Sequence, residues 1–124
     1  IPESHPLSKK NTLKFNDISG QDFVSFPKGT YIRYELENIL AKNRVKCRVK
    51  LETRSTLDIY QHVKHGAGIS IVFPFIQFGE KPIPGTLFKA IDGDFKLSLA
   101  IMSSRRKDLS LVAKKFIEII SQFS

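Results

Sequence analysis

Strand-like runs alternate with helix-like segments through the middle of the chain, and this order restricts the fold more than any other feature of the sequence. Strand periodicity falls near 23–26, 45–51 and 69–73. Helical periodicity falls between these runs, near 31–42 and 56–65. Strands separated by helices of this length pair in parallel through right-handed crossovers. The sequence therefore predicts an α/β fold with a parallel, Rossmann-like sheet.

Both central helices carry end signals. Thr30 precedes the first helix and Ser55 or Thr56 precedes the second, where hydroxyl side chains accept hydrogen bonds from free backbone N–H groups. Asn43 follows the first helix and Gly66 follows the second, where the backbone can turn left-handed. Charged residues are expected on the outer positions of the first helix: Arg33, Glu35, Glu37 and Lys42. The inner stripe of the second helix is expected to hold Leu57, Tyr60, Val63 and Lys64.

The strands are predicted from shorter patterns. Val45 to Leu51 alternates apolar with basic residues, which predicts a strand with one buried face. Ile69 to Phe73 is continuously apolar and stops at Pro74, as in a fully buried strand. The first fifteen residues look irregular, and a single turn capped by Asn16 is expected to end at Gly20.

The last third of the chain predicts two more strands and a helix. Leu87 to Ile91 and Phe95 to Met102 are strand candidates that flank the turn Asp92-Gly93-Asp94. Ser110 is expected to cap the final helix. Apolar residues recur on one side of that helix: Val112, Phe116, Ile119, Ile120 and Phe123.

Composition is that of an ordinary globular domain. The 124 residues suffice for one domain, and no run approaches the ~18 apolar residues needed to cross a bilayer. No signal-peptide pattern opens the chain, so we expect a cytoplasmic protein without membrane contact. The single cysteine, Cys47, excludes an internal disulfide. The net charge of +8 raises nucleic-acid contact as an alternative to a lysine-rich surface, although the basic residues are spread along the chain.

Two loops follow predicted strands and open predicted helices. In a parallel sheet such loops meet at the carboxyl edge, where ligands bind. Helix N-termini are receptive to anions, and Lys28 and Arg54 add positive charge. Arg54 suits a carboxylate, because a guanidinium can donate two parallel hydrogen bonds. The hydroxyl residues can instead serve only as helix caps. The candidate ligand-binding residues are Phe26, Pro27, Lys28, Gly29, Thr30, Thr53, Arg54, Ser55 and Thr56.

Patterns for catalysis or metal binding are weak. His62 and His65 lie three residues apart on one helix but lack a further ligand for a metal site. Cys47 lies in the middle of a predicted strand and is interpreted as a small core residue. Gly66-Ala67-Gly68 follows a helix and precedes a strand, the reverse of the order in a phosphate loop. We therefore expect no enzyme, with no catalytic residues, metal or cofactor.

Several groups of residues keep the order and spacing of a known family. They are His5-Pro6-Leu7, Asp17 to Val24, Arg33 to Leu36, Glu52-Thr53 with Val63 to Pro74, and Leu109-Ser110 with Phe116. Together they resemble the effector-binding domain of LysR-type transcriptional regulators. The resemblance implies a periplasmic-binding-protein type II fold, in which a small effector binds between two lobes. It also implies a dimer or tetramer that binds DNA through an N-terminal winged helix-turn-helix, which is absent from this sequence.

The resemblance divides the chain into two parts. Residues 1–103 would form the second lobe with hinge strands at its ends, and residues 104–124 a helix that returns to a first lobe absent from this sequence. The leading interpretation is a sensory module for a small anionic metabolite. Two alternatives stay open, namely one lobe of a transport-type solute-binding protein and a basic nucleic-acid-binding module. Basic residues clustered on one face with exposed aromatics would favour the last.

Overall fold

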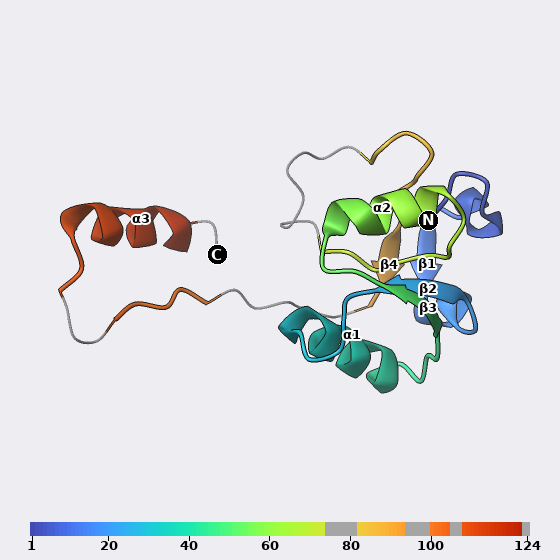
Figure 1. The fold of residues 1–124 in the computed structure, drawn as a ribbon, viewed down its shortest axis with the longest axis horizontal. Helices are drawn as coiled ribbons and strands as arrows, with labels where there is room; N and C mark the ends of the chain where they lie inside the picture. Colours follow the sequence, from blue (N-terminus) through green and yellow to red (C-terminus); the bar gives the residue numbers. More distant parts are fainter. Residues whose placement is uncertain (74–81, 94–99, 105–107, 123–124) are drawn as a thin grey trace.

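The computed structural model describes residues 1–73, 82–93, 100–104 and 108–122. Its main body contains two pairs of parallel strands, and one long helix covers each face of the central pair (Figure 1). A third helix, α3 (Leu111–Ser121), lies apart from this body (Figure 1). The expected α/β class with parallel strands is therefore confirmed.

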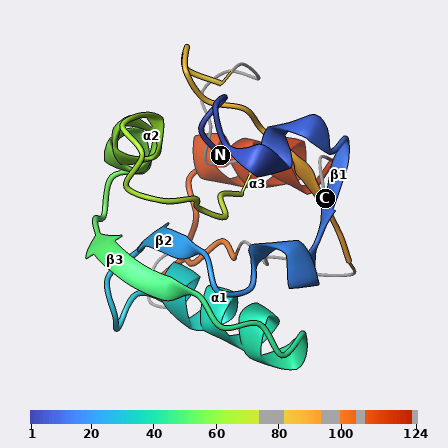
Figure 2. The ribbon, with the colours of Figure 1, turned by 90° about the vertical axis from the view of Figure 1, so that its right-hand side faces the viewer.

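The central strands are β2 (Asp22–Ser25) and β3 (Arg48–Glu52), which pair in parallel. On the other side of β2, Phe23 forms a parallel bridge with Ile69, and the Ile69 amide donates to the Asp22 carbonyl over 2.9 Å. Figure 2 shows β2 and β3 side by side between α1 and α2. β2 is thus the middle of three parallel segments, which confirms the predicted parallel core.

Two of these segments are shorter strands than predicted. β3 begins at Arg48 rather than Val45, because Arg44 is left-handed with a φ of 56° and the Val45 amide still donates to the Leu40 carbonyl. The run from Ile69 to Phe73 is not a strand beyond its one bridge. The reason is that β2 ends two residues past that bridge and offers little backbone to pair with.

The two long helices lie where the sequence predicts them. α1 (Tyr31–Lys42) has Thr30 as its N-cap and Asn43 as its C-cap. α2 (Thr56–Lys64) is followed by Gly66, whose φ of 82° is the left-handed conformation expected after a helix. Local signals alone therefore determine the bounds of these helices.

The core forms two clusters on the opposite faces of β2, because successive strand residues point to opposite sides. The first cluster, which includes one α1 residue, contains Leu13, Phe15, Ile18, Phe23, Leu36, Val45, Ile69 and Ile71. The second, which includes two α2 residues, contains Val24, Phe26, Ile59 and Val63.

The predicted inner stripe of α2 is wrong at two positions, because both Leu57 and Lys64 are exposed. Ile59 is buried and Leu57 is exposed. Val63 lies six positions after Leu57, which places the two side chains about 240° apart around a helix. Ile59 precedes Val63 by one turn, so these two share the face that packs against β2.

β3 does not bury the whole face that its alternation predicts. Val45 is buried and Cys47 is half-buried, but Val49 is 41% exposed. In the described part of the chain β3 pairs only with β2, so its other edge carries no partner strand. This face of the body is therefore partly apolar and open.

The second pair of strands brings together an early and a late segment of the chain. β1 (Thr12–Lys14) pairs in parallel with β4 (Ala90–Asp92), so the expectation of an irregular first segment is wrong here. Leu13 is buried, and that single apolar side chain anchors β1. A 3₁₀ turn (Phe15–Ile18) follows, and Lys14 rather than Asn16 is its N-cap. Its first turn is closed by Asp17, whose Oδ2 accepts from the Lys14 amide over 2.8 Å.

The predicted strands of the last third are only partly present. The strand expected over 87–91 is confined to β4. Most of the strand expected over 95–102 lies outside the described residues, and 100–102 forms no strand. The residue Asp94 of the expected turn is also outside them.

The final helix is capped by Ser110, as predicted, but it buries none of its side chains. Phe116 is 59% exposed and Ile120 is 38% exposed. Within the described ranges no helix is long and apolar enough to cross a membrane. The apolar face of α3 thus stays largely exposed in the described part of the chain.

Candidate functional site

The carboxyl ends of β2 and β3 lie side by side. Ser25 stands opposite Glu52 in the parallel register, and the Thr53 amide donates to the Ser25 carbonyl over 2.9 Å. Phe26 to Thr30 leads from β2 into α1, and Thr53 to Thr56 leads from β3 into α2. The two loops therefore leave the same edge of the strand pair, each at a helix N-terminus. We call this region the carboxyl edge.

Hydroxyl groups at the carboxyl edge are engaged in helix capping. Thr30 Oγ1 accepts from the Arg33 amide over 3.3 Å, and Ser55 Oγ accepts from the Asp58 amide over 3.3 Å. Thr53 Oγ1 donates to Asp58 Oδ2 over 3.3 Å. These contacts show that both loops are ordered by their own side chains, and they leave the ligand-binding role as a prediction.

The other candidate residues differ in how much they offer a ligand. The Phe26 side chain is buried with the α2 cluster, so only its backbone faces the edge. Gly29 has a φ of 83° and forms the turn before α1. Lys28 and Arg54 are exposed. The two cations are therefore the most exposed of the candidate side chains.

The two helix N-termini differ in charge. α2 has Asp58 in its first turn, where a carboxylate already balances the positive end of the helix dipole. α1 has no acidic residue in its first turn and follows Lys28 closely. The N-terminus of α1 is therefore the more receptive of the two to an anion.

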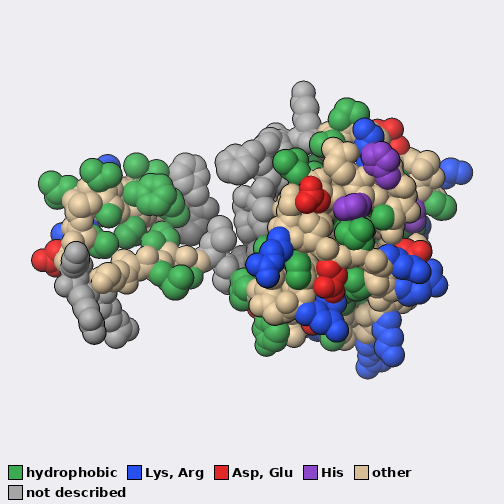
Figure 3. Space-filling view, viewed as in Figure 1, with side chains coloured by type: hydrophobic (Ala, Val, Ile, Leu, Met, Phe, Trp, Pro, Cys, Tyr) green, Lys and Arg blue, Asp and Glu red, His purple; other side chains and the backbone are tan. Residues whose placement is uncertain are grey.

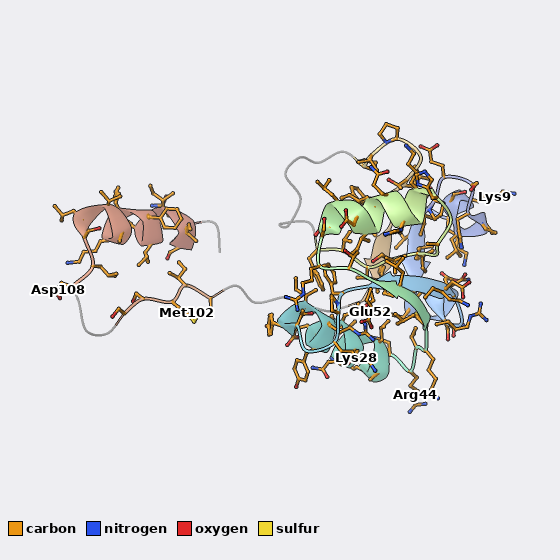
Figure 4. The ribbon with its side chains drawn as sticks, in the orientation of Figure 1. Lys9, Lys28, Arg44, Glu52, Met102 and Asp108 are labelled. Atoms are coloured by element: carbon orange, nitrogen blue, oxygen red, sulfur yellow. The ribbon has the colours of Figure 1, made fainter. Side chains whose placement is uncertain are left out.

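Arg33, expected on the outer side of α1, is instead buried, with 6% exposure. Its Nη1 donates to the Phe26 carbonyl and to Glu52 Oε1, both over 2.8 Å. Its Nε donates to Glu37 Oε1 over 2.7 Å. The spacing of Arg33 and Glu37 by one helical turn is a signal in the sequence, but the contact with Glu52 depends on the fold. Figure 4 shows Lys28 and Glu52 on the α1 side of the body.

Two hollows adjoin Arg33. The smaller, of about 470 Å³, is lined by Lys28, Arg33, Cys47, Val49, Lys50, Leu51 and Glu52. The larger, of about 650 Å³, lies between α1 and the β2–β3 pair and is mainly apolar. Ser25 lines the larger hollow, and its buried hydroxyl has no hydrogen-bond partner in the part of the chain that the structure describes. Arg54 lines neither of these hollows.

Groups suited to catalysis are not gathered in the described part of the chain. No three His, Cys, Asp or Glu side chains there are placed to hold a metal ion. Burial raises the pKa of the Cys47 thiol, and its Sγ donates to the Ile18 carbonyl over 3.4 Å. A raised pKa disfavours the reactive thiolate, so Cys47 behaves as a core residue.

Basic side chains are scattered over the surface. On the face in Figure 3, Lys and Arg lie at several separate places on the body with acidic side chains between them. Arg48 Nε contacts Asp22 Oδ1 over 2.8 Å, and this hydrogen bond is the main reason that the pKa of Asp22 is lowered. This view offers no continuous basic path for a nucleic-acid strand.

Comparison with known proteins gives a consistent result. The family model for the LysR substrate binding domain matches residues 1–124. The chain is 32% identical over 74 residues to the transcriptional activator protein LysR of Escherichia coli (strain K12), which is 60% of this chain and 24% of that protein. It is 26% identical over 124 residues to the transcriptional dual regulator GltC of Bacillus subtilis (strain 168), covering 99% of this chain and 41% of that protein.

Two solved structures share the fold. The CcmR regulatory domain of Synechocystis PCC6803, in complex with 2-PG, matches with a TM-score of 0.75 at 23% identity and covers 98% of this chain and 59% of that chain. HinK, a LysR family transcriptional regulator from Pseudomonas aeruginosa, matches with a TM-score of 0.74 at 15% identity and covers 95% of this chain and 41% of that chain. The chain spans less than half the length of the two curated relatives described above.

Proposed function

The chain belongs to the LysR substrate-binding domain family, and from this premise we propose that it is the effector-sensing module of a transcriptional regulator. Its fold is the periplasmic-binding-protein type II fold of LysR regulatory domains. The proposed ligand is a small anionic metabolite, held at the carboxyl edge by Phe26 to Thr30 and Thr53 to Thr56.

One observation carries the proposal, namely the register that places Ser25 opposite Glu52. Because the strands are parallel, both following loops start from one edge, and both end in the N-terminus of a helix. Ligands of open α/β sheets bind at such an edge. The edge is an attractive place for a ligand because its backbone N–H groups need no rearrangement to meet an acceptor.

The charge of the edge supports an anion as the ligand class. Lys28 is exposed beside the α1 N-terminus, which lacks an acidic residue, and Arg54 is exposed beside α2. A regulatory domain of the same fold has been solved with 2-PG. We infer that an anionic group of the ligand lies closer to Lys28 than to Arg54, because Asp58 offsets the α2 dipole.

The complete regulator is part of the proposal. We propose that residues 1–103 are one lobe and that residues 104–124 return to a first lobe, so that the effector lies between two lobes. We further propose that the regulator is a dimer or tetramer and that it contacts DNA through a winged helix-turn-helix outside these residues. No catalytic step is proposed.

Titration with small anions tests the ligand class and the edge together. Inorganic phosphate, 2-PG and short dicarboxylates are added to the complete regulator, and binding is measured by calorimetry. Lys28→Gln is expected to weaken binding of any anion that binds by about three- to tenfold, because one charge-assisted contact is lost. Arg54→Gln is expected to have a smaller effect, while DNA affinity without ligand stays unchanged in both.

Lys42→Gln is the matched control, since Lys42 carries the same charge at the opposite end of α1. A loss that is equal for Lys28→Gln and Lys42→Gln would show only long-range attraction. That outcome would contradict an anion site at the carboxyl edge. Simultaneous loss of anion binding and DNA affinity would indicate a folding defect instead.

A further inference from the structure

Arg33 is placed against the usual charge preference of its helix. It lies in the first turn of α1, where the positive end of the helix dipole disfavours a cation. Its guanidinium is also buried, which costs free energy unless acceptors surround it. The three acceptors that compensate come from three different segments: the Phe26 carbonyl, Glu52 at the end of β3, and Glu37 one turn further along α1.

These three contacts join the parts that the proposed site needs in a fixed arrangement. Phe26 begins the first loop, and Glu52 is the last residue before the second loop. A single atom, Arg33 Nη1, donates to the Phe26 carbonyl and to Glu52 Oε1, both over 2.8 Å. The guanidinium therefore links the points at which the two loops begin. A lysine has the same charge but no planar fork, and it cannot hold the same set of acceptors in one geometry.

We propose that Arg33 is the positioning residue of the carboxyl edge, which sets the spacing of the two loops and couples that spacing to α1. The proposal rests on the proposed function for its ligand, although the positioning itself does not. An anion that draws the loops together changes the distance between Phe26 and Glu52. The Arg33 side chain moves with these acceptors, and its hydrogen bond to Glu37 transmits that movement to the next turn of α1.

The larger hollow is the surface that a movement of α1 would change. Arg33 lines both hollows, and the larger one runs between α1 and β3 with an open apolar lining. A small shift of α1 against β3 therefore changes the shape of this surface directly.

The test compares two glutamates that contact the same guanidinium. Glu52→Ala removes the acceptor that joins the loop stems, and Glu37→Ala removes the acceptor on α1. Both side chains are exposed, so neither variant leaves a cavity in the core. Hydrogen exchange of the backbone amides is measured in the complete chain without ligand. Glu52→Ala is expected to speed exchange of both loops by about tenfold, since it removes a charged hydrogen bond, and Glu37→Ala is expected to leave the loops unchanged.

Arg33→Lys separates position from charge. It is expected to resemble Glu52→Ala in the loops, although it keeps the positive charge. Equal loop exchange in parent, Glu52→Ala and Arg33→Lys would overturn the proposal. If Arg33→Lys unfolds, the glutamate variants decide the result, and loop exchange in Glu52→Ala that equals the parent's overturns the proposal.

Addition of inorganic phosphate or 2-PG tests the coupling. In the parent, a bound probe is expected to slow exchange in the loops and to alter exchange in α1. In Glu37→Ala the loops are expected to respond and α1 to stay unaltered, and a full α1 response would contradict the coupling through Arg33. If the parent binds neither probe nor any other small anion, the proposed function fails, whereas the ligand-free comparison still decides the positioning role.

Discussion

Ser25 lies directly opposite Glu52 at the ends of two parallel strands, although 27 positions separate them in the sequence numbering. This pairing brings together two helix N-termini that the chain order alone keeps apart. It also leaves the Ser25 side chain fully buried, and among the described residues its hydroxyl has no hydrogen-bond partner. A buried hydroxyl without a partner lowers the stability of the folded state.

Ser25→Ala is therefore expected to maintain the free energy of unfolding or raise it by about 1 kcal/mol, because it removes an unpaired polar group and almost no volume. Urea unfolding followed by circular dichroism measures this change. Ile59→Ala is the control for a buried position, and its expected loss is about 2–5 kcal/mol because a large apolar side chain is removed from the core. A loss of several kcal/mol for Ser25→Ala would show that the hydroxyl has a partner in solution.

Sequence reasoning succeeds where the signals are local. Thr30 and Asn43 cap α1 as predicted, because capping involves residues within one turn of the chain. It fails where the partner is distant. Val49 alternates like a half-buried strand residue but is exposed, because β3 has a neighbour on one edge only in the described part of the chain. The sequence does not predict a strand at Leu13, because its partner strand lies almost eighty residues away.

The candidate site shows the same division. Its two loops are predictable, because each follows a strand and opens a helix in the sequence. Helical periodicity places Arg33 on the outer face of α1, because periodicity alone does not reveal an acceptor on a neighbouring strand. The contact with Glu52 spans 19 positions and needs the parallel pairing of β2 and β3 to form. Buried polar side chains of this kind are the part of a site that periodicity misses.

Cys47 gives a prediction for the pH dependence of stability. Burial raises the pKa of its thiol above the ordinary value of an exposed cysteine, so the unfolded chain loses this proton at a lower pH than the folded chain does. The stability that the neutral thiol contributes is therefore present below pH 9 and declines as the pH rises through the unfolded value. Urea midpoints of parent and Cys47→Ala are measured between pH 7.5 and 10, roughly spanning the usual thiol range. The parent is expected to lose more stability than the variant across this range, and parallel curves would contradict the prediction.

The open side of β3 predicts self-association. Val49 is exposed beside the apolar hollow against α1, and an exposed apolar surface of this kind favours contact with a second copy of the chain. Val49→Lys is expected to lower the light-scattering mass at concentrations well above micromolar, because a charge would be buried in the contact. Leu57→Lys is the control, since Leu57 is equally apolar and exposed on α2. A monomeric mass for the parent, or an equal effect of both variants, would count against this interface.

The last prediction concerns the uncovered apolar face of α3. Phe116 and Ile120 are exposed, and neither packs into the two core clusters of the body. Each such side chain gains roughly 1.5–3 kcal/mol when it is fully buried, so the whole stripe favours a partner by on the order of 10 kcal/mol. We predict that the partner is the first lobe of the complete regulator. An isolated 124-residue chain should then aggregate through α3 at high concentration.

The double variant Phe116→Ser, Ile120→Ser is expected to reduce concentration-dependent turbidity while leaving the urea midpoint of the body unchanged. Lys115→Gln is the control, because Lys115 is exposed on the same helix and pairs with Glu118 over 2.9 Å. In the complete regulator the same double variant should instead destabilise the protein, since the stripe is buried there. If the double variant lowers the urea midpoint of the isolated chain, α3 packs on its own body in solution, and the assignment of 104–124 to another lobe is wrong.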